Sequence, residues 1–328
     1  MEVSTLEMDE DGNLIHSETY PPVDESERQD SSAIMTDCSA YCVVTDDGKL
    51  YMGQDEFERY APASITKVLT ALVVCELAPM DQVVTVSEYA LDTIAIASSG
   101  VTPSLKPGEK LTVEQLLYAM ILPSTNAAAA VLAEACAGTQ SGFARLMNTK
   151  AKSLGCQNSH FSNPHGLDAE DHYTCAYDMA LIMRAAMMNE QCAKILSAKN
   201  YTIPATEMSP ARAMSMGHAM VNRSYYCEGA FAGKTGSTVN AGKTLVTAAT
   251  RNGKTFYVCT LHSTSGMQYY DTDNVIRFAF ARWTQTKTSL NRFIYDVKMT
   301  ASNLQGATFS YKVAQPGLTG HAVFWNLA

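Results

Sequence analysis

Three short motifs in this 328-residue chain carry side chains that together could perform acyl transfer through a serine. The motifs are Ser64-Ile65-Thr66-Lys67, Ser124-Thr125-Asn126 and Lys234-Thr235-Gly236. They supply a nucleophilic hydroxyl, an amine that can take its proton, a second hydroxyl that can relay it, and a cation for an anionic substrate end. No histidine belongs to the set, so lysine would have to act as the base.

The first motif places Ser64 and Lys67 at positions i and i+3, which lie on the same side of a helix about one turn apart. An apolar run over residues 68–74 follows, so the pattern predicts that Ser64 lies at the start of a mostly buried helix. A serine hydroxyl is a weak nucleophile until an adjacent base removes its proton, and lysine is a base only when neutral. Burial and a second nearby cation both lower a lysine pKa. Alone, S-x-x-K is a weak signal that occurs by chance.

The second motif is predicted to lie on a turn between two buried helices. Thr112 and Gln115 form a capping-box pattern that begins the first helix, and Pro123 ends it. Residues 127–137 are nearly all apolar and predict the second helix. The alternative is that the serine and asparagine of this motif merely cap that second helix.

The third motif begins a predicted strand. Residues 243–250 and 255–261 are rich in β-branched residues, and the Asn252-Gly253 pair between them indicates a hairpin. A strand edge offers N–H groups to an extended peptide or to a developing oxyanion. The alternative is that the glycines of this segment only shape an edge strand.

In this order, S-x-x-K, S-x-N and K-T-G are the motif set of penicillin-binding proteins and class A β-lactamases. The chain resembles the D-alanyl-D-alanine carboxypeptidases of peptidase family S11, the low-molecular-mass penicillin-binding proteins, over roughly residues 35–285. The matching stretches are residues 62–72, 112–120, 161–168, 234–238 and 241–242. Residues 163–172 lack the E-x-x-x-N pattern of a class A β-lactamase, which favours the carboxypeptidase.

The resemblance implies catalytic roles for three residues. Ser64 would attack the carbonyl between the last two D-alanines of a peptidoglycan stem peptide and form an acyl-enzyme. Lys67 would be the general base, and Ser124 would pass the proton to the departing D-alanine. Water would then hydrolyse the ester. β-Lactams resemble this peptide end and would act as covalent inhibitors that leave slowly.

The resemblance also implies how the substrate is held. Asn126 would bind its peptide backbone, and Lys234 would attract its terminal carboxylate with hydroxyl donors from Thr235 and Thr238. The oxyanion hole would consist of the backbone N–H groups of Ser64 and Ser237, and each such donor contributes about a hundred- to a thousandfold in rate. Two other functions stay open, namely a penicillin-recognising sensor without turnover and a β-lactamase. An endopeptidase acting on cross-links is a variant of the same chemistry.

No metal or cofactor is expected. His160, His165 and His172 invite a zinc interpretation, but their spacing matches no compact zinc motif. The family resemblance already explains His165 and His172 as parts of a loop near the site.

The net charge of -9 comes from one segment, because residues 1–30 hold ten acids and one base. We expect residues 1–33 to form an acidic flexible arm and residues 34–286 the catalytic domain. Residues 287–328 would form a short β-rich segment with strands at 292–299, 307–313 and 321–325, a reduced or truncated second domain. The rest of the chain is neutral and has no basic patch that would indicate nucleic acid as a partner.

The expected fold class is an α/β (α+β) sandwich. Strands at 41–44 and 49–52 would form an N-terminal hairpin that pairs beside the last strands in one antiparallel sheet. Helices would lie on its faces, with a helical block from about residue 64 to 190. Further helices are expected at residues 140–154 and 174–188, and a closing helix at 273–282. The resemblance implies the penicillin-binding-protein and β-lactamase type of transpeptidase fold.

The chain shows no signal peptide and no membrane-spanning run. Because the presumed substrate lies outside the cytoplasm, our hypothesis is an extracytoplasmic protein, secreted or anchored, whose leader and anchor are absent from this chain. Membrane association would then need those segments. Nine cysteines, an odd number without a C-x-x-C pair, are expected to be mostly free thiols.

Overall fold

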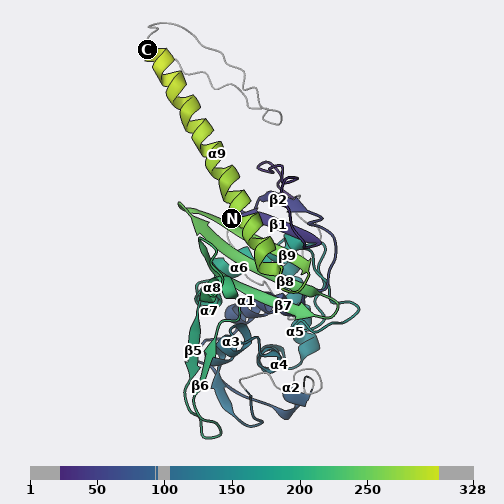
Figure 1. Ribbon diagram of the computed structural model, residues 1–328. Coiled ribbons are helices and arrows are strands. Elements are labelled where there is room, and N and C mark those ends of the chain that lie inside the picture. The colour runs from purple at the N-terminus through teal and green to yellow at the C-terminus, as the bar shows by residue number, and fades with distance from the viewer. Residues whose placement is uncertain (1–22, 93, 95–103, 303–328) are drawn as a thin grey trace, which may run out of the picture. The chain divides into compact units, whose positions relative to one another are not determined.

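A five-stranded antiparallel sheet carries the fold in the computed structural model, which describes residues 23–92, 94 and 104–302. Its strand order is β2-β1-β9-β8-β7 (Figure 1). The strands are β1 Ala40–Thr45, β2 Leu50–Gln54, β7 Ala230–Thr238, β8 Gly242–Arg251 and β9 Lys254–Ser263. Because β1 pairs with β9, the prediction that the first hairpin joins the last strands is confirmed.

Local sequence explains the hairpin between β8 and β9. Asn252 and Gly253, between β8 and β9, have φ angles of 50° and 78°, as a two-residue turn with both central residues left-handed requires. β1 is buried along its whole length because both of its faces are covered. Cys259 and Leu261 of β9 belong to the main hydrophobic cluster on one face. On the other face, Thr260 is hydrogen bonded to Thr272 of the last helix, Oγ1 to Oγ1, at 2.9 Å.

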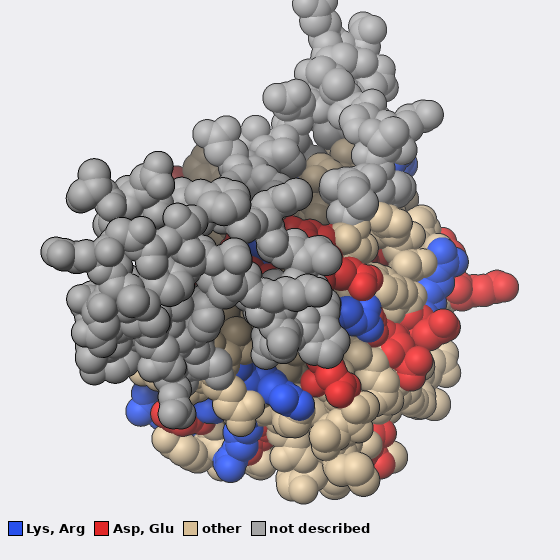
Figure 2. Space-filling model, turned by 90° about the horizontal axis from the view of Figure 1, so that it is seen from above, with Lys and Arg blue, Asp and Glu red and all other residues tan. Residues whose placement is uncertain are grey.

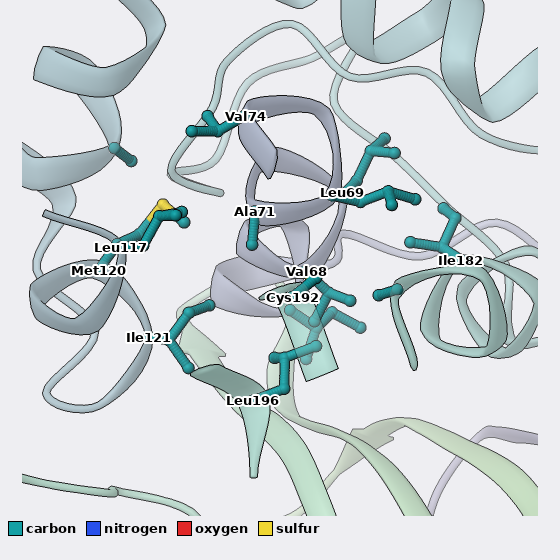
Figure 3. Packing of buried hydrophobic residues seen from close by; sticks show 14 of the residues in the cluster. Val68, Leu69, Ala71, Val74, Leu117, Met120, Ile121, Ile182, Cys192 and Leu196 are labelled. Carbon is teal, nitrogen blue, oxygen red and sulfur yellow. The ribbon is translucent and has the colours of Figure 1, made fainter. Parts of the chain in front are cut away.

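The helices surround α1, which follows directly on the short 3-10 helix η1. The elements are η1 Ala63–Thr66, α1 Lys67–Leu77, α3 Val113–Ile121, α4 Asn126–Ala137, α5 Gln140–Ser153, α6 Ala176–Met188 and α7 Glu190–Leu196. Figure 3 shows α1 contributing Val68, Ala71 and Val74 to a core that also receives side chains from α3, α6 and α7. The predicted capping box of Thr112 and Gln115 is present at the start of α3. The expected helices 140–154 and 174–188 are confirmed as α5 and α6.

Short elements complete the described part. They are β3 Val83–Thr85, α2 Glu88–Asp92, β4 Lys110–Thr112, β5 Asn200–Ile203, β6 Arg212–Ser215, α8 Ala219–Asn222 and α9 Gln268–Ser302. β3 pairs with β4, and β5 pairs with β6, each as a two-stranded antiparallel sheet. No helix within the described residues is both long and apolar enough to cross a bilayer. All nine cysteines are free thiols, as expected.

Residues 24–29, part of the segment expected to be a flexible arm, are paired with the sheet region. Leu50 donates its backbone N–H to the Asp24 carbonyl at 3.0 Å, and Gln29 donates to Tyr51 at 2.7 Å. Arg28 also forms an ion pair of 2.6 Å with Glu56. The prediction of a flexible arm through residue 33 is therefore wrong for residues 24–29, because these residues pair with the backbone and side chains of the sheet region. Residues 1–22 lie outside the described part.

The strand expected at 292–299 is also wrong, because these residues lie within α9. Phe293 and Val297 are four residues apart, a spacing that suits a helix, and no glycine or proline interrupts residues 268–302. The strands expected at 307–313 and 321–325 lie outside the described residues. The chain divides into two compact units, Met1–Ala279 and Phe280–Ala328, so the division falls inside α9 rather than after residue 286. The assignment of domains to functions stays a prediction.

Charged side chains of both signs lie close to one another on the face shown in Figure 2. In the described part of the chain, Lys194 forms an exposed ion pair with Glu114 at 2.8 Å. Such exposed pairs contribute little to stability, about 0 to 1 kcal/mol each. The apolar core described above therefore carries most of the stability.

A loop at residues 162–168 packs tightly against η1. Thr70 donates its hydroxyl to the Pro164 carbonyl at 2.7 Å, and the His172 ring is 2.9 Å from the Thr66 hydroxyl. Gly166 lies so close that an added Cβ would be 1.9 Å from the Ala63 carbonyl oxygen. The loop therefore fixes the backbone on which Ser64 stands.

Substitution of Gly166 tests this contact. Gly166 and Gly138 both have positive φ, 85° and 72°, but a Cβ at Gly138 would meet no atom within 4 Å. Alanine at either position costs about 1 kcal/mol through the left-handed backbone. Only Gly166→Ala adds a collision, which costs about 1–3 kcal/mol. We expect urea denaturation to show the larger loss for Gly166→Ala, and equal losses would contradict the close packing.

Candidate active site

Ser64 and Lys67 meet at the junction of η1 and α1. The Lys67 Nζ lies 2.8 Å from the Ser64 Oγ, within hydrogen-bond distance. Ser64 belongs to the 3-10 helix η1, in which side chains at i and i+3 lie directly above one another, so the motif spacing produces this contact. Ser64 is partly exposed, whereas Lys67 is fully buried. The Ser64 hydroxyl is therefore accessible from outside, whereas the amine that it contacts is shielded from water.

The partners of Lys67 determine where its lone pair can point. Its Nζ lies 2.7 Å from Asn126 Oδ1 and 2.6 Å from the His165 carbonyl oxygen. Both are acceptors, so they take the two N–H groups of a neutral amine. Among the partners that the described residues offer, the Ser64 hydroxyl is then the one toward which the lone pair can point. Burial first, and the charge of Lys234 second, hold the pKa of Lys67 well below its usual value. This arrangement suits a general base.

Ser124 lies on the turn between α3 and α4, as predicted, and Asn126 is the first residue of α4. The interpretation that they merely cap α4 is wrong, because Thr125 is the N-cap residue and its side chain makes no capping bond. Ser124 has a φ angle of 68°, an unusual conformation for a residue other than glycine. Ala63, next to the nucleophile, also has positive φ, 51°. Such strain is typical of functional sites.

Lys234 reaches the same site from β7. Its Nζ donates to Ser124 Oγ at 2.9 Å and to the Thr235 carbonyl at 2.9 Å. Burial lowers the pKa of Lys234 to about 7. β7 can lie close to η1 because Gly236 has no side chain: a Cβ there would be 3.0 Å from the Ala63 Cβ and 3.0 Å from the Pro62 carbonyl oxygen. The K-T-G motif thus brings a second amine to the Ser124 hydroxyl.

The end of β7 departs from one expectation. Thr238 was expected to offer its hydroxyl to substrate, but that hydroxyl donates to Asp168 Oδ1 at 2.6 Å. Asp168 belongs to the loop against η1, so this bond ties the loop to β7. Ser237, expected to supply an oxyanion-hole N–H, accepts a hydrogen bond on its Oγ from Lys243 at 2.9 Å. The substrate-binding and oxyanion-hole roles of these residues stay predictions.

Sequence reasoning missed three partners of the site. The His165 carbonyl holds Lys67, the Asp168 carboxylate holds Thr238, and the Lys243 ammonium contacts Ser237. A backbone carbonyl leaves no signature in the sequence. Lys243 could have been found only by aligning β7 with β8, in which Ser237 pairs with Lys243.

The histidines near the site have structural partners. The two ring nitrogens of His172 lie 2.9 Å from Thr66 Oγ1 and 3.0 Å from the Ser162 backbone nitrogen. Burial lowers the pKa of His165 to about 3 and that of His172 to about 4. Within the described ranges, no three His, Cys, Asp or Glu side chains gather in a metal-binding arrangement.

The chain matches one known protein family over most of its length. Residues 25–265 match the family described as peptidase S11, D-alanyl-D-alanine carboxypeptidase. The chain belongs to this family. The three motifs that the structure joins at one site are therefore those of a serine penicillin-binding enzyme.

The match to this chain covers different shares of the relatives' lengths. D-alanyl-D-alanine carboxypeptidase DacB2 of Mycobacterium tuberculosis is 33% identical over 234 residues, which are 69% of this chain and 76% of that protein. DacF of Bacillus subtilis is 35% identical over 156 residues, 48% of this chain and 40% of that protein. DacA of Escherichia coli is 33% identical over 224 residues, 65% and 53%. The chain thus spans less than two thirds of the Bacillus and Escherichia proteins.

Solved structures share the fold. The DD-transpeptidase of Streptomyces K15 has a TM-score of 0.69 at 29% identity, over 75% of this chain and 98% of that one. The D-alanyl-D-alanine carboxypeptidase of Mycobacterium tuberculosis has a TM-score of 0.70 at 29% identity, over 78% and 96%. The expected transpeptidase fold is confirmed.

The depressed pKa of Lys234 predicts how stability depends on pH. Between about pH 7 and the ordinary lysine value of 10.5, the unfolded chain binds more protons at this residue than the folded one. The contribution of Lys234 to the free energy of unfolding therefore rises with pH, by at most about 1.4 kcal/mol per pH unit. We expect the unfolding free energy of the wild type to rise relative to that of Lys234→Met as the pH rises through this window.

Urea denaturation at several pH values measures this difference. Lys199 is exposed, so Lys199→Met serves as the control and should show no such trend. If the difference in unfolding free energy between wild type and Lys234→Met does not change with pH, the lowered pKa of this buried amine is contradicted.

Proposed function

We propose that this protein is a serine-type D-Ala-D-Ala carboxypeptidase that removes the terminal D-alanine from peptidoglycan stem peptides. The observation that carries the proposal is the contact of Ser64 with a buried Lys67 whose other partners are both acceptors. Family membership supports the substrate class. β-Lactams would acylate the same serine. The reaction belongs outside the cytoplasm, where such peptides are found.

Acylation begins when Lys67 takes the Ser64 proton and the Oγ attacks the carbonyl between the two D-alanines. The oxyanion of the tetrahedral intermediate would be held by the backbone N–H groups of Ser64 and Ser237. Lys234 donates to Ser124 Oγ, so the Ser124 hydroxyl hydrogen can point to the leaving nitrogen. Ser124 then gives this proton to the departing amine and regains one from Lys67.

Deacylation reverses the direction of proton transfer. The C–N bond has broken, D-alanine has left, and Lys67 is again neutral. A water molecule gives its proton to Lys67 as its oxygen attacks the ester, and Ser64 leaves with that proton. Asn126 and the His165 carbonyl keep the amine aimed at the reacting atoms throughout.

Intact mass spectrometry after exposure to benzylpenicillin tests the nucleophile. We expect the wild type to gain the mass of one penicillin and Ser64→Ala to gain none. The exposed Ser265 is the matched control, and Ser265→Ala should be labelled like wild type. Equal labelling of Ser64→Ala would refute the assignment. Release of D-alanine from diacetyl-Lys-D-Ala-D-Ala then distinguishes a carboxypeptidase from a sensor that is labelled but releases none.

The pH dependence of acylation tests the base. Acylation requires neutral Lys67, so its rate falls as the pH drops through the pKa of Lys67. Lys234→Met removes a charge that lowers this pKa, so we expect the acid limb of the rate profile to move to higher pH. Thr235→Val is the control, since it changes the binding strand but keeps both amines. An unmoved midpoint in Lys234→Met would show that Lys67 is not the titrating base.

A further inference from the structure

Lys234 is poorly placed to be the main attraction for an anion that arrives from water. It is 2% exposed, and its ammonium already donates to Ser124 Oγ and to the Thr235 carbonyl. Since burial brings its pKa to about 7, a neutral solution holds both charged and uncharged forms. Long-range attraction of a carboxylate requires a charge nearer to solvent.

Lys243 supplies such a charge on the neighbouring strand. It lies on β8 directly opposite Ser237 of β7 and is partly exposed. Its Nζ donates to Ser237 Oγ at 2.9 Å. Among the described residues, no acidic side chain forms an ion pair with Lys243. Asp168, which approaches the end of β7, accepts from Thr238 Oγ1 at 2.6 Å and from the Asn240 backbone N–H at 3.4 Å.

The Lys243–Ser237 bond leaves a donor available. An ammonium group only donates, so Ser237 Oγ must be the acceptor, and its hydroxyl hydrogen can turn toward another group. Ser237 also carries the N–H proposed for the oxyanion hole. In a D-Ala-D-Ala peptide, the terminal carboxylate lies only a few bonds from the scissile carbonyl. A peptide with its carbonyl at the Ser237 N–H therefore has its carboxylate within reach of this side-chain pair.

We propose that Lys243 and Ser237 form a binding site for the terminal carboxylate of the substrate, a site that rests on the function proposed above. Lys243 provides a partly exposed ammonium group near the start of β8, and Ser237 provides an oriented hydroxyl. Lys234 then has a different main task, which is to hold Ser124 and to lower the pKa of Lys67. Substrates that lack a free carboxylate gain nothing from Lys243.

Two thioester substrates that differ only in this group test the site. Diacetyl-Lys-D-Ala-thioglycolate has a free carboxylate at the position of the terminal D-alanine, and its methyl ester has none. We expect Lys243→Gln to lower kcat/KM for the carboxylate roughly 3- to 10-fold, chiefly through KM, as for a partly exposed charged hydrogen bond. The methyl ester should be turned over as by wild type. Rising salt should shrink the difference.

Two further variants sharpen the outcome. Lys243→Arg keeps the charge and should retain most of the carboxylate preference, whereas Lys199→Gln removes an exposed lysine elsewhere and should change neither substrate. Equal losses on both substrates, or no loss on the carboxylate, would overturn the carboxylate site while leaving the carboxypeptidase proposal standing. If wild type turns over neither thioester and gains no acyl group, both proposals fall.

Discussion

The structure depends on one buried amine. Lys67 is fully buried between two carbonyl oxygens, and its remaining hydrogen-bond partner among the described residues is the Ser64 hydroxyl. Burial of an uncompensated charge costs several kcal/mol, so the amine is held toward its neutral form. A neutral amine with both N–H groups occupied is a base with a defined direction. This constraint replaces the histidine of other serine enzymes.

Three parts of the chain must meet to create that environment. η1 brings Ser64, α4 brings Asn126 directly after the turn that follows α3, and the loop at 162–168 brings the His165 carbonyl. Each is mounted on rigid structure: η1 continues into the central helix of the core, and the turn connects two helices whose inner faces are buried. Left-handed backbone at Ala63 and Ser124 shows that this precision is obtained at some expense of local stability.

The second amine extends the same electrostatic logic. Lys234 is buried and bonded to Ser124, so its charge acts on the inside of the site, where a low dielectric strengthens its effect on Lys67. Lys243 lies toward solvent on the next strand, where charges are screened but accessible. The two lysines thus suit different tasks because they differ in burial. Lys234 belongs to β7, and Lys243 lies on β8 and contacts Ser237 of β7.

The sequence by itself determined a large share of this protein. Motif order and flanking residues indicated the family, and capping and turn residues such as Thr112 and Asn252-Gly253 predicted elements that the structure contains. These signals are local, and local backbone preferences act over a few residues. Where a spacing suited two structures, as in residues 292–299, local reasoning chose the wrong one.

Only the tertiary structure decided the state of the site. That Lys67 faces a backbone carbonyl of residue 165, that Thr238 gives its hydroxyl to Asp168, and that Lys243 contacts Ser237 depend on packing between distant segments. Burial, and with it the pKa of both site lysines, is likewise a property of everything packed around a side chain. A sequence names the groups that can react, whereas the fold sets their distances and their exclusion from water.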